Sequence, residues 1–300
     1  MIRVLHFSDV HVEDGFADVP VRDFLNKRFV AYVNLLLNRR RHFTESRPKL
    51  AALAEFMREQ RIDVSICTGD YTALGTHPEL ALARQAIEPL TKAPHGFVTV
   101  PGNHDLYLPD TVIDGRFDKY FGNLLRTDLP GLSVDGIWPQ VRLIGDHLAI
   151  VAVNSSRPNS VVYLSSGRVP DDQLELLARI VEDERVKDRF VLVATHYAPR
   201  LSNGLPDRPT HGLENAEALF EALRSVDRGA IVFGHVHRRY HVRVSDVAMS
   251  LCSAGSATQH GREGIWVYEI GPHEARGIPG TWNGERYVLL PDEAVFLHAG

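Results

Sequence analysis

Cysteine is scarce in this chain, which has only Cys67 and Cys252 among its 300 residues. A fold held by disulfides or by a cysteine-rich zinc site needs more thiols than that. Cys67 lies in an apolar run that begins at Val64, so we expect a buried, reduced thiol. Because reduced thiols are typical of cytoplasmic proteins, we predict a cytoplasmic location.

Long hydrophobic runs are also missing. A helix that crosses a bilayer needs about 20 apolar residues in a row, and the most apolar stretch, residues 29–37, is shorter and contains Asn34. The chain runs from Met1 into the polar residues around Asp9 without a charged leader or cleavage site, so we expect no secretory signal. Repeats and obvious linkers are absent too, which favours one domain over residues 1–300.

Positive charge is in deficit overall, because the formal net charge is -5. We therefore expect no nucleic acid partner, since such proteins carry an excess of basic residues. The exception is residues 20–49, where eight basic residues stand against two acidic ones. Most of this basic segment falls in an insertion that we place at about 20–47, and we expect it to meet a different partner from the rest of the chain.

Short runs rich in Val and Ile alternate with helical patterns. The runs predict buried strands at residues 2–7, 62–67, 97–100, 148–153, 190–194 and 230–233. The helical patterns cover residues 49–60, 78–90, 118–125, 171–184 and 214–224. This alternation predicts an α/β fold. From about residue 239, strand-like pieces at 240–244, 265–270 and 287–290 indicate an antiparallel C-terminal region that completes a second sheet.

Five polar motifs follow these strands. They are Asp9-Val10-His11, Gly69-Asp70, Gly102-Asn103-His104-Asp105, His196 and Gly234-His235-Val236-His237. Ligands bind at the carboxyl ends of strands in open α/β sheets, so we expect the motifs to converge. Imidazole, carboxylate and amide ligands together suit Mn, Fe or Zn. Two such divalent metal ions can share a hydroxide aimed at phosphorus, which predicts hydrolysis of a phosphoester substrate.

The ordered set resembles the calcineurin-like metallophosphoesterases, and every motif position of that family is filled here. The resemblance implies two stacked mixed sheets flanked by helices, a four-layer α-β-β-α sandwich with the metal site at the strand carboxyl ends. It implies that His104 is a catalytic residue that donates to the phosphoryl oxygen or to the leaving group, and that Asp105 orients its ring. It also implies two metal sites that share Asp70, the first completed by Asp9, His11 and His237 and the second by Asn103, His196 and His235.

Two features bear on the substrate. His211 lies in the loop 206–214 after His196, and it would contact the substrate if that loop folds over the metals. The insertion carries apolar residues at helical spacing and then three arginines, Arg39 to Arg41. It either packs on the main body, or forms a lid or acyl-chain pocket, or makes a peripheral contact with an anionic membrane or lipid at the inner membrane surface.

Three functions stay open. The insertion favours cleavage of a phosphodiester or pyrophosphate bond in a nucleotide-linked acylated glycolipid, as in the family's UDP-diacylglucosamine pyrophosphatases. The well-known proteobacterial pyrophosphatases of that pathway carry Arg where this chain has His104. The Gly-Asn-His-Asp form of the third motif is instead shared with 3',5'-cyclic-nucleotide phosphodiesterases. A non-catalytic scaffold is the third alternative, and its signature would be lost ligand residues, of which this chain shows none.

Overall fold

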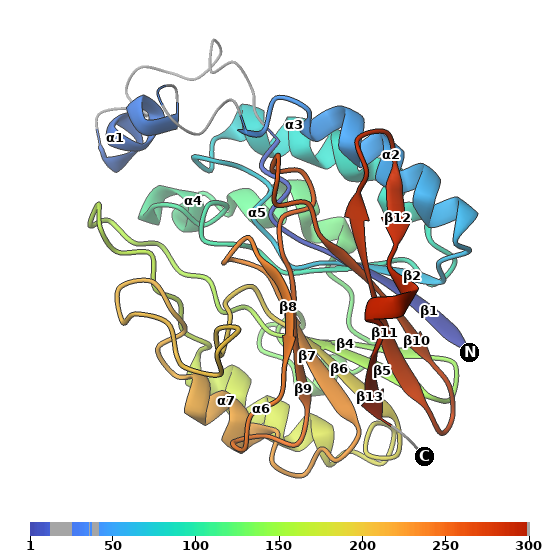
Figure 1. Cartoon of the computed structure of the whole chain (residues 1–300). Helices are drawn as coiled ribbons and strands as arrows, with labels where there is room; N and C mark the ends of the chain where they lie inside the picture. Colours follow the sequence, from blue (N-terminus) through green and yellow to red (C-terminus); the bar gives the residue numbers. More distant parts are fainter. Residues whose placement is uncertain (13–25, 36, 38–41, 299–300) are drawn as a thin grey trace.

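The computed structural model describes residues 1–12, 26–35, 37 and 42–298, and every structural statement concerns these residues. Two sheets pack face to face, and helices cover both outer faces (Figure 1). The predicted four-layer sandwich is therefore confirmed.

The first sheet has the strand order β12-β11-β10-β1-β2-β3, and β13 also pairs with β11. Its strands are β1 (Ile2–Phe7), β2 (Val64–Cys67), β3 (Phe97–Thr99), β10 (Ile265–Ile270), β11 (Ala275–Trp282), β12 (Tyr287–Leu289) and β13 (Val295–His298). Strands β1, β2 and β3 are parallel, while β10 lies antiparallel to β1. The carboxyl ends of the three parallel strands thus share one edge.

The second sheet has the order β4-β5-β6-β7-β9-β8. Its strands are β4 (Gln140–Ile144), β5 (Leu148–Ala152), β6 (Phe190–Ala194), β7 (Gly229–Phe233), β8 (Arg239–Val242) and β9 (Ser250–Ala254). Strands β5, β6, β7 and β9 run parallel to one another. This sheet therefore also gathers its strand ends at one edge.

Seven α-helices complete the described part of the chain. They are α1 (Lys27–Asn34), α2 (Ser46–Glu59), α3 (His77–Ile87), α4 (Pro109–Ile113), α5 (Arg116–Phe121), α6 (Asp171–Val181) and α7 (Ala216–Ala222). Short 3-10 turns lie at Glu88–Lys92, Gly122–Leu124, Pro130–Leu132 and Pro291–Glu293. In Figure 1, α2 and α3 cover the first sheet, and α6 and α7 lie on the opposite outer face.

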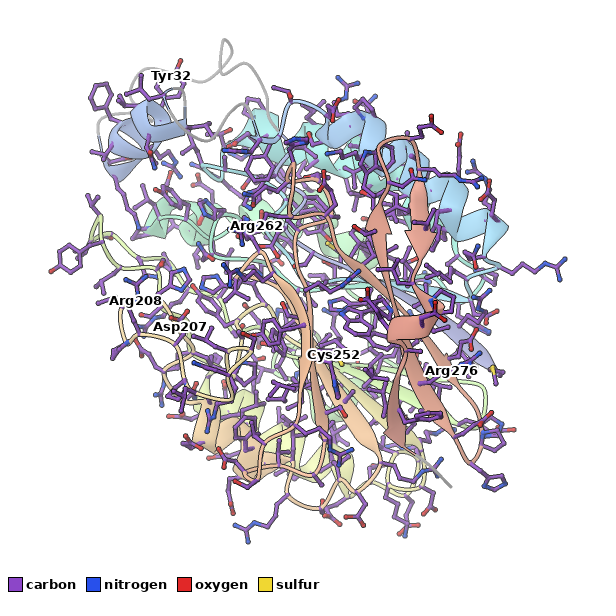
Figure 2. The ribbon with its side chains drawn as sticks, in the orientation of Figure 1. Tyr32, Asp207, Arg208, Cys252, Arg262 and Arg276 are labelled. Carbon is purple, nitrogen blue, oxygen red and sulfur yellow. The ribbon has the colours of Figure 1, made fainter. Side chains whose placement is uncertain are left out.

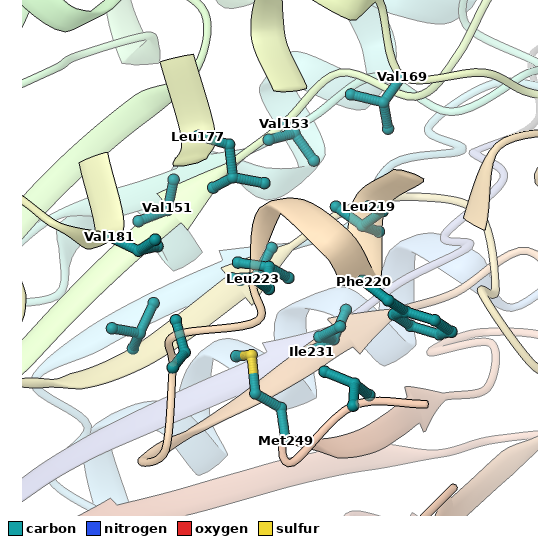
Figure 3. Packing of buried hydrophobic residues seen from close by; sticks show 14 of the residues in the cluster. Val151, Val153, Val169, Leu177, Val181, Leu219, Phe220, Leu223, Ile231 and Met249 are labelled. Atoms are coloured by element: carbon teal, nitrogen blue, oxygen red, sulfur yellow. The ribbon is translucent and has the colours of Figure 1, made fainter. Parts of the chain in front are cut away.

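Three apolar layers hold the sandwich together. Successive side chains of β1 point to opposite faces of the sheet. Leu5 therefore packs toward α2 and α3, while Val4 lies in the layer between the sheets. On the other outer face, α6 and α7 bury Leu177, Leu219 and Leu223 against Val151 and the rest of the second sheet (Figure 3). Because both faces of both sheets are covered, the sequences of the central strands are continuous apolar runs. These strands could therefore be predicted from the sequence.

The C-terminal region differs from the expectation of one antiparallel addition to a second sheet. Strand β9 is parallel to β7, and β10 to β13 extend the first sheet. Strand β11 was not predicted because Gly277, Pro279 and Gly280 interrupt its apolar pattern. The polar residues of β9 (sequence Ser-Leu-Cys-Ser-Ala) hid a strand that is buried throughout.

The insertion is described at α1 and at its flanks, and the remainder of residues 20–47 lies outside the described residues. One side of α1 packs on the main body, where Leu35 contacts a small cluster around Leu74 and Tyr107. The other side leaves apolar side chains exposed, namely Phe29, Val30 and Val33. Within the described residues, no helix combines the length and apolar character that a bilayer span requires.

Candidate metal centre

The predicted motifs meet where the parallel strands of both sheets end. Asp9 and His11 follow β1, Asp70 follows β2, and Asn103 and His104 follow β3. The second sheet contributes His196 after β6 and the pair His235 and His237 after β7. The structure therefore brings all seven predicted ligand residues and His104 to one place.

The backbone of this centre is strained. Five of the seven predicted ligand residues have left-handed φ angles. Residues other than glycine rarely adopt these angles, which cost on the order of 1–3 kcal/mol each. These angles are 52° at Asp9, 36° at His11, 58° at Asp70, 70° at His235 and 49° at His237. Such strain is typical of sites where geometry serves function rather than stability.

Two glycines allow the motifs to approach one another. A Cβ added at Gly102 would lie 2.1 Å from the Asp70 Oδ1 atom, and one at Gly234 would lie 1.9 Å from the Ser8 Oγ atom. Neither contact is sterically feasible. The glycines of the third and fifth motifs thus make room for the side chains that follow the first two strands.

Hydrogen bonds fix the tautomers of His11 and His237. The His11 Nδ1 atom lies 2.8 Å from the carbonyl oxygen of Thr72, so it carries the proton and leaves the lone pair on Nε2. His237 Nδ1 bonds the side-chain oxygen of Gln259, with the same result. The two Nε2 atoms lie 3.2 Å apart, and His237 Nε2 is 3.1 Å from Asp9 Oδ1. Acceptors therefore face acceptors, as around a metal ion.

The second group has the same arrangement. His196 Nδ1 donates to the Thr68 carbonyl at 2.7 Å, so its Nε2 lone pair faces Asn103 Oδ1 at 3.1 Å and Asp70 Oδ2 at 3.6 Å. His235 Nε2 donates to the carbonyl oxygen of His211 at 2.9 Å, and its Nδ1 faces Asn103 Oδ1 at 2.9 Å. Backbone acceptors behind each ring thus orient the lone pairs inward, which is the usual support of metal-bound histidine.

The chemistry of this donor set fits two divalent ions. Asp9 Oδ1 is buried and accepts no hydrogen bond from the described residues. Burial also lowers the pKa of His196 and of His235, which keeps both rings in the neutral form that binds metal. Buried lone pairs that face one another without protons need positive charge between them, so the residues match the expected cofactors.

Asp207 and His211 lie beside His235. The Asp207 and His211 side chains hydrogen-bond at 2.6 Å, and the rings of His211 and His235 lie 4.2 Å apart. Ligand atoms of Asp207, His211 and His235 are close enough to hold an ion. However, His235 Nε2 already donates to the His211 carbonyl, so we interpret Asp207 and His211 as supporting groups and not as the second metal site.

His211 nonetheless lines the same cavity as the metal-facing groups. This cavity has a volume of about 500 Å³, and Asp70, Asn103, His104 and His235 also line it. Figure 2 shows Asp207 and Arg208 on the loop after β6, on the same side of the molecule as Tyr32 of α1. A contact between His211 and substrate stays a prediction, with a geometry that permits it.

The expected role of Asp105 is wrong. The His104 ring is oriented by the carbonyl oxygen of Ala73, which lies 2.6 Å from Nδ1. Both Asp105 oxygens instead accept backbone N–H groups, from Asp70 at 2.9 Å, Tyr71 at 2.9 Å and Gly102 at 2.8 Å. Burial, with repulsion from Asp70, raises the pKa of Asp105 to about 7. Asp105 therefore clamps the loops after β2 and β3 together.

A family model described as calcineurin-like phosphoesterase matches residues 2–239. The chain belongs to this family. This calcineurin-like phosphoesterase is a phosphoester hydrolase, and its site supports two divalent metals.

Solved structures share the fold at low sequence identity. A dimetal phosphatase from Danio rerio has a TM-score of 0.67 and 14% identity, with 100% of this chain and 99% of that chain covered. A purple acid phosphatase from yellow lupin (Lupinus luteus) seeds gives 0.63 and 12%, covering 99% of this chain and 54% of that one. The anchor in the inner membrane complex of Plasmodium gives 0.52 and 10%, covering 100% and 89%. A search of curated proteins found no match.

Several supporting groups of the phosphoesterase could not be found from sequence. Four of them are backbone carbonyls, of Thr68, Thr72, Ala73 and His211, and a carbonyl carries no signal in residue type. Gln259 lies 22 residues after His237 and outside every motif. Its side chain is an ordinary acceptor, so only the fold shows that it supports a ligand.

Proposed function

We propose that this calcineurin-like phosphoesterase hydrolyses a phosphodiester or pyrophosphate bond in a substrate with an apolar part. The observation that carries this proposal is the set of inward-facing lone pairs on His11, His196, His235 and His237 around the carboxylate of Asp70. Bound there, two divalent ions would neutralise the phosphoryl oxygens and lower the pKa of the attacking water. Mn, Fe and Zn all suit these ligands.

His104 is the residue that we assign to the leaving group. Its Nδ1 proton is held by Ala73, so Nε2 is the nitrogen that serves substrate. The backbone N–H of His104 donates to Asp70 Oδ1 at 2.8 Å, which ties this residue to the carboxylate that would hold both ions. In the imidazolium form both ring nitrogens carry a proton, so Nε2 gives its proton to the leaving oxygen as the bond from phosphorus breaks, and the ring returns to the neutral form with its proton on Nδ1.

The environment of α1 guides the choice of substrate. One of its exposed apolar side chains, Val30, lines a groove that His104 also lines, which supports a substrate with an acyl or other apolar part. A nucleotide-linked acylated glycolipid, as cleaved by UDP-diacylglucosamine pyrophosphatases, is therefore our first candidate. The 3',5'-cyclic nucleotides are the second, supported by the Gly-Asn-His-Asp form of the third motif.

A substrate panel tests the proposal. The protein, loaded in turn with Mn, Fe or Zn, is assayed on a UDP-linked acyl sugar, cAMP, an aryl phosphodiester and an aryl phosphomonoester. We expect metal-dependent turnover with the acyl sugar preferred. Preference for cAMP would select the second candidate. No bound metal and no turnover of any member would favour the non-catalytic scaffold.

We also propose that the protein is cytoplasmic and that its insertion makes a peripheral contact with an anionic lipid surface. The exposed apolar residues of α1 are joined by Val161, Val162 and Tyr163 of a loop that Lys27 contacts. Sedimentation with vesicles containing anionic phosphatidylglycerol tests this contact. Phe29→Ser combined with Val33→Ser should abolish binding, whereas Phe296→Ser, an exposed phenylalanine on β13, should leave it intact. Equal binding by all variants would refute the contact.

A further inference from the structure

A second, smaller groove adjoins the metal cavity at His104. Its volume is about 150 Å³, and its apolar lining includes Tyr107, Val162 and Leu35, the residue that follows α1. A cavity of this size holds about one six-membered ring. Because His104 lines both cavities, a substrate with its phosphoryl group at the metal centre can extend its leaving group into this groove.

Lys27 is the cationic residue of the groove lining. Its ammonium donates to the carbonyl oxygens of Asn159 at 3.0 Å and Leu164 at 2.9 Å. Both of these acceptors are neutral, and the side chain is half-buried. An ammonium has three N–H groups, so one donor, and a charge with no counter-ion among the described residues, are left for a ligand. Burying such a charge is costly unless an anion arrives, which points to an anionic group in the groove.

Tyr107 connects this charge to the proton donor. The Lys27 Nζ atom lies 4.8 Å from the centre of the Tyr107 ring. The same ring stacks on His104 with a centroid distance of 5.6 Å and an interplanar angle of 10°. The positive charge therefore lies one aromatic ring beyond the residue that we assign to the leaving oxygen. A negative charge on the leaving group would fall near it.

We propose that Lys27 and Tyr107 form a leaving-group subsite for a phosphate monoester that carries a ring-sized body, so that the scissile bond is a pyrophosphate bond. This proposal rests on the proposed phosphoester hydrolase function. In the reaction, the oxygen of water bonds to the attacked phosphorus, and the bond from that phosphorus to the bridging oxygen breaks. The bridging oxygen leaves with the electron pair on the second phosphate and takes a proton from His104, while the attacking water releases a proton to solvent. Lys27 neutralises the remaining charge of the leaving phosphate.

Two matched substrates test the subsite. P1,P2-diphenyl diphosphate loses phenyl phosphate, and 4-nitrophenyl phenyl phosphate loses an aryl oxide without a phosphate. Lys27→Met should lower kcat/KM for the diphosphate about ten-fold relative to the diester, since a hydrogen bond to a charged group is lost. Calorimetry with the methylene-bridged diphosphonate analogue should show a similar rise in Kd. Lys119→Met removes a matched lysine that lies 5.7 Å from the Tyr120 ring. It should change neither the ratio of the two kcat/KM values nor the Kd of the analogue.

The outcomes separate the subsite from the function. If Lys27→Met lowers activity on both substrates equally, Lys27 only holds α1 in place and the subsite is refuted. If Lys27→Met leaves kcat/KM for both substrates unchanged, the subsite is refuted as well. If the unmodified enzyme cleaves neither substrate with any of the three metals, the proposed function itself fails. Turnover of the diester alone would leave the hydrolase standing and overturn the pyrophosphate assignment.

Discussion

The guanidinium of Arg28 donates to both carboxylate oxygens of Asp110, at 2.8 and 2.9 Å. Arg28 is fully buried, and its Nε donates to the Leu74 carbonyl at 2.8 Å. Leu74 follows Ala73, the residue whose carbonyl orients the His104 ring. The insertion is thereby tied to the loop that positions the proton donor, through α4 and through the backbone.

Loss of this tie should weaken both the fold and catalysis. Arg28→Met leaves the Leu74 carbonyl without its donor and Asp110 with Arg116 alone, so we expect the free energy of unfolding to fall by roughly 1–3 kcal/mol. Urea denaturation measures this loss. Arg168→Met, which removes an exposed ion pair with Asp171 at 2.7 Å, is the matched control and should change stability by less than about 1 kcal/mol. Equal effects would show that the buried pair has no special role.

Metal removal should destabilise the protein. Ions that bind only the folded state stabilise it, and without them the acceptors around Asp70 repel one another. We expect the chelated protein to melt roughly 5–10 °C lower and to recover with Mn, Fe or Zn. Asp70→Asn should lose most of this metal-dependent shift and slow hydrolysis on the order of 1000-fold. A full metal response in Asp70→Asn would contradict the bridging role.

The sequence was informative where a residue type carries the function and silent where the backbone does. The apolar run of β1 ends at a polar pair, Asp9 and His11, so strand and ligands were both visible. Asp105 was assigned to orient the His104 ring because the two residues are adjacent in the sequence. The assignment was wrong because sequence spacing does not fix the directions of side chains in a tight loop. The left-handed conformation of His235 likewise has no signal in its neighbours. The division of the chain into one domain with an insertion stays a prediction.

Variants of His104 and Asp105 should now behave differently. His104→Ala removes a side chain at the cavity, so we expect metals to stay bound while turnover falls about 100-fold or more. Asp105→Asn turns one acceptor oxygen into a donor that faces backbone N–H groups, and it should cost roughly 2 kcal/mol or more of stability and weaken metal binding. Metal analysis and urea denaturation distinguish the two. Loss of metal in His104→Ala, with Asp105→Asn fully stable, would reverse the assignment.

His6 should make the fold sensitive to acid. The ring is buried between the hydroxyls of Tyr268 and Thr68, at 3.1 Å from each, and burial lowers its pKa to about 3. The unfolded chain takes up this proton near the ordinary pKa of about 6.5, whereas the folded protein stays neutral there. The His6 contribution is thus complete above pH 6.5 and declines as the pH falls toward 3, by about 1.4 kcal/mol per pH unit.

Urea denaturation of the wild type and His6→Gln measures this effect, because other titrating groups cancel in the difference. Neutral glutamine cannot gain a proton in the unfolded chain. The stability of the wild type relative to His6→Gln should therefore fall by about 2 kcal/mol between pH 6 and pH 4.5. The same comparison with His95→Gln, an exposed histidine, corrects for the loss of a surface imidazole. A difference that stays constant over this range would mean that His6 is protonated as easily in the folded protein as in the unfolded chain.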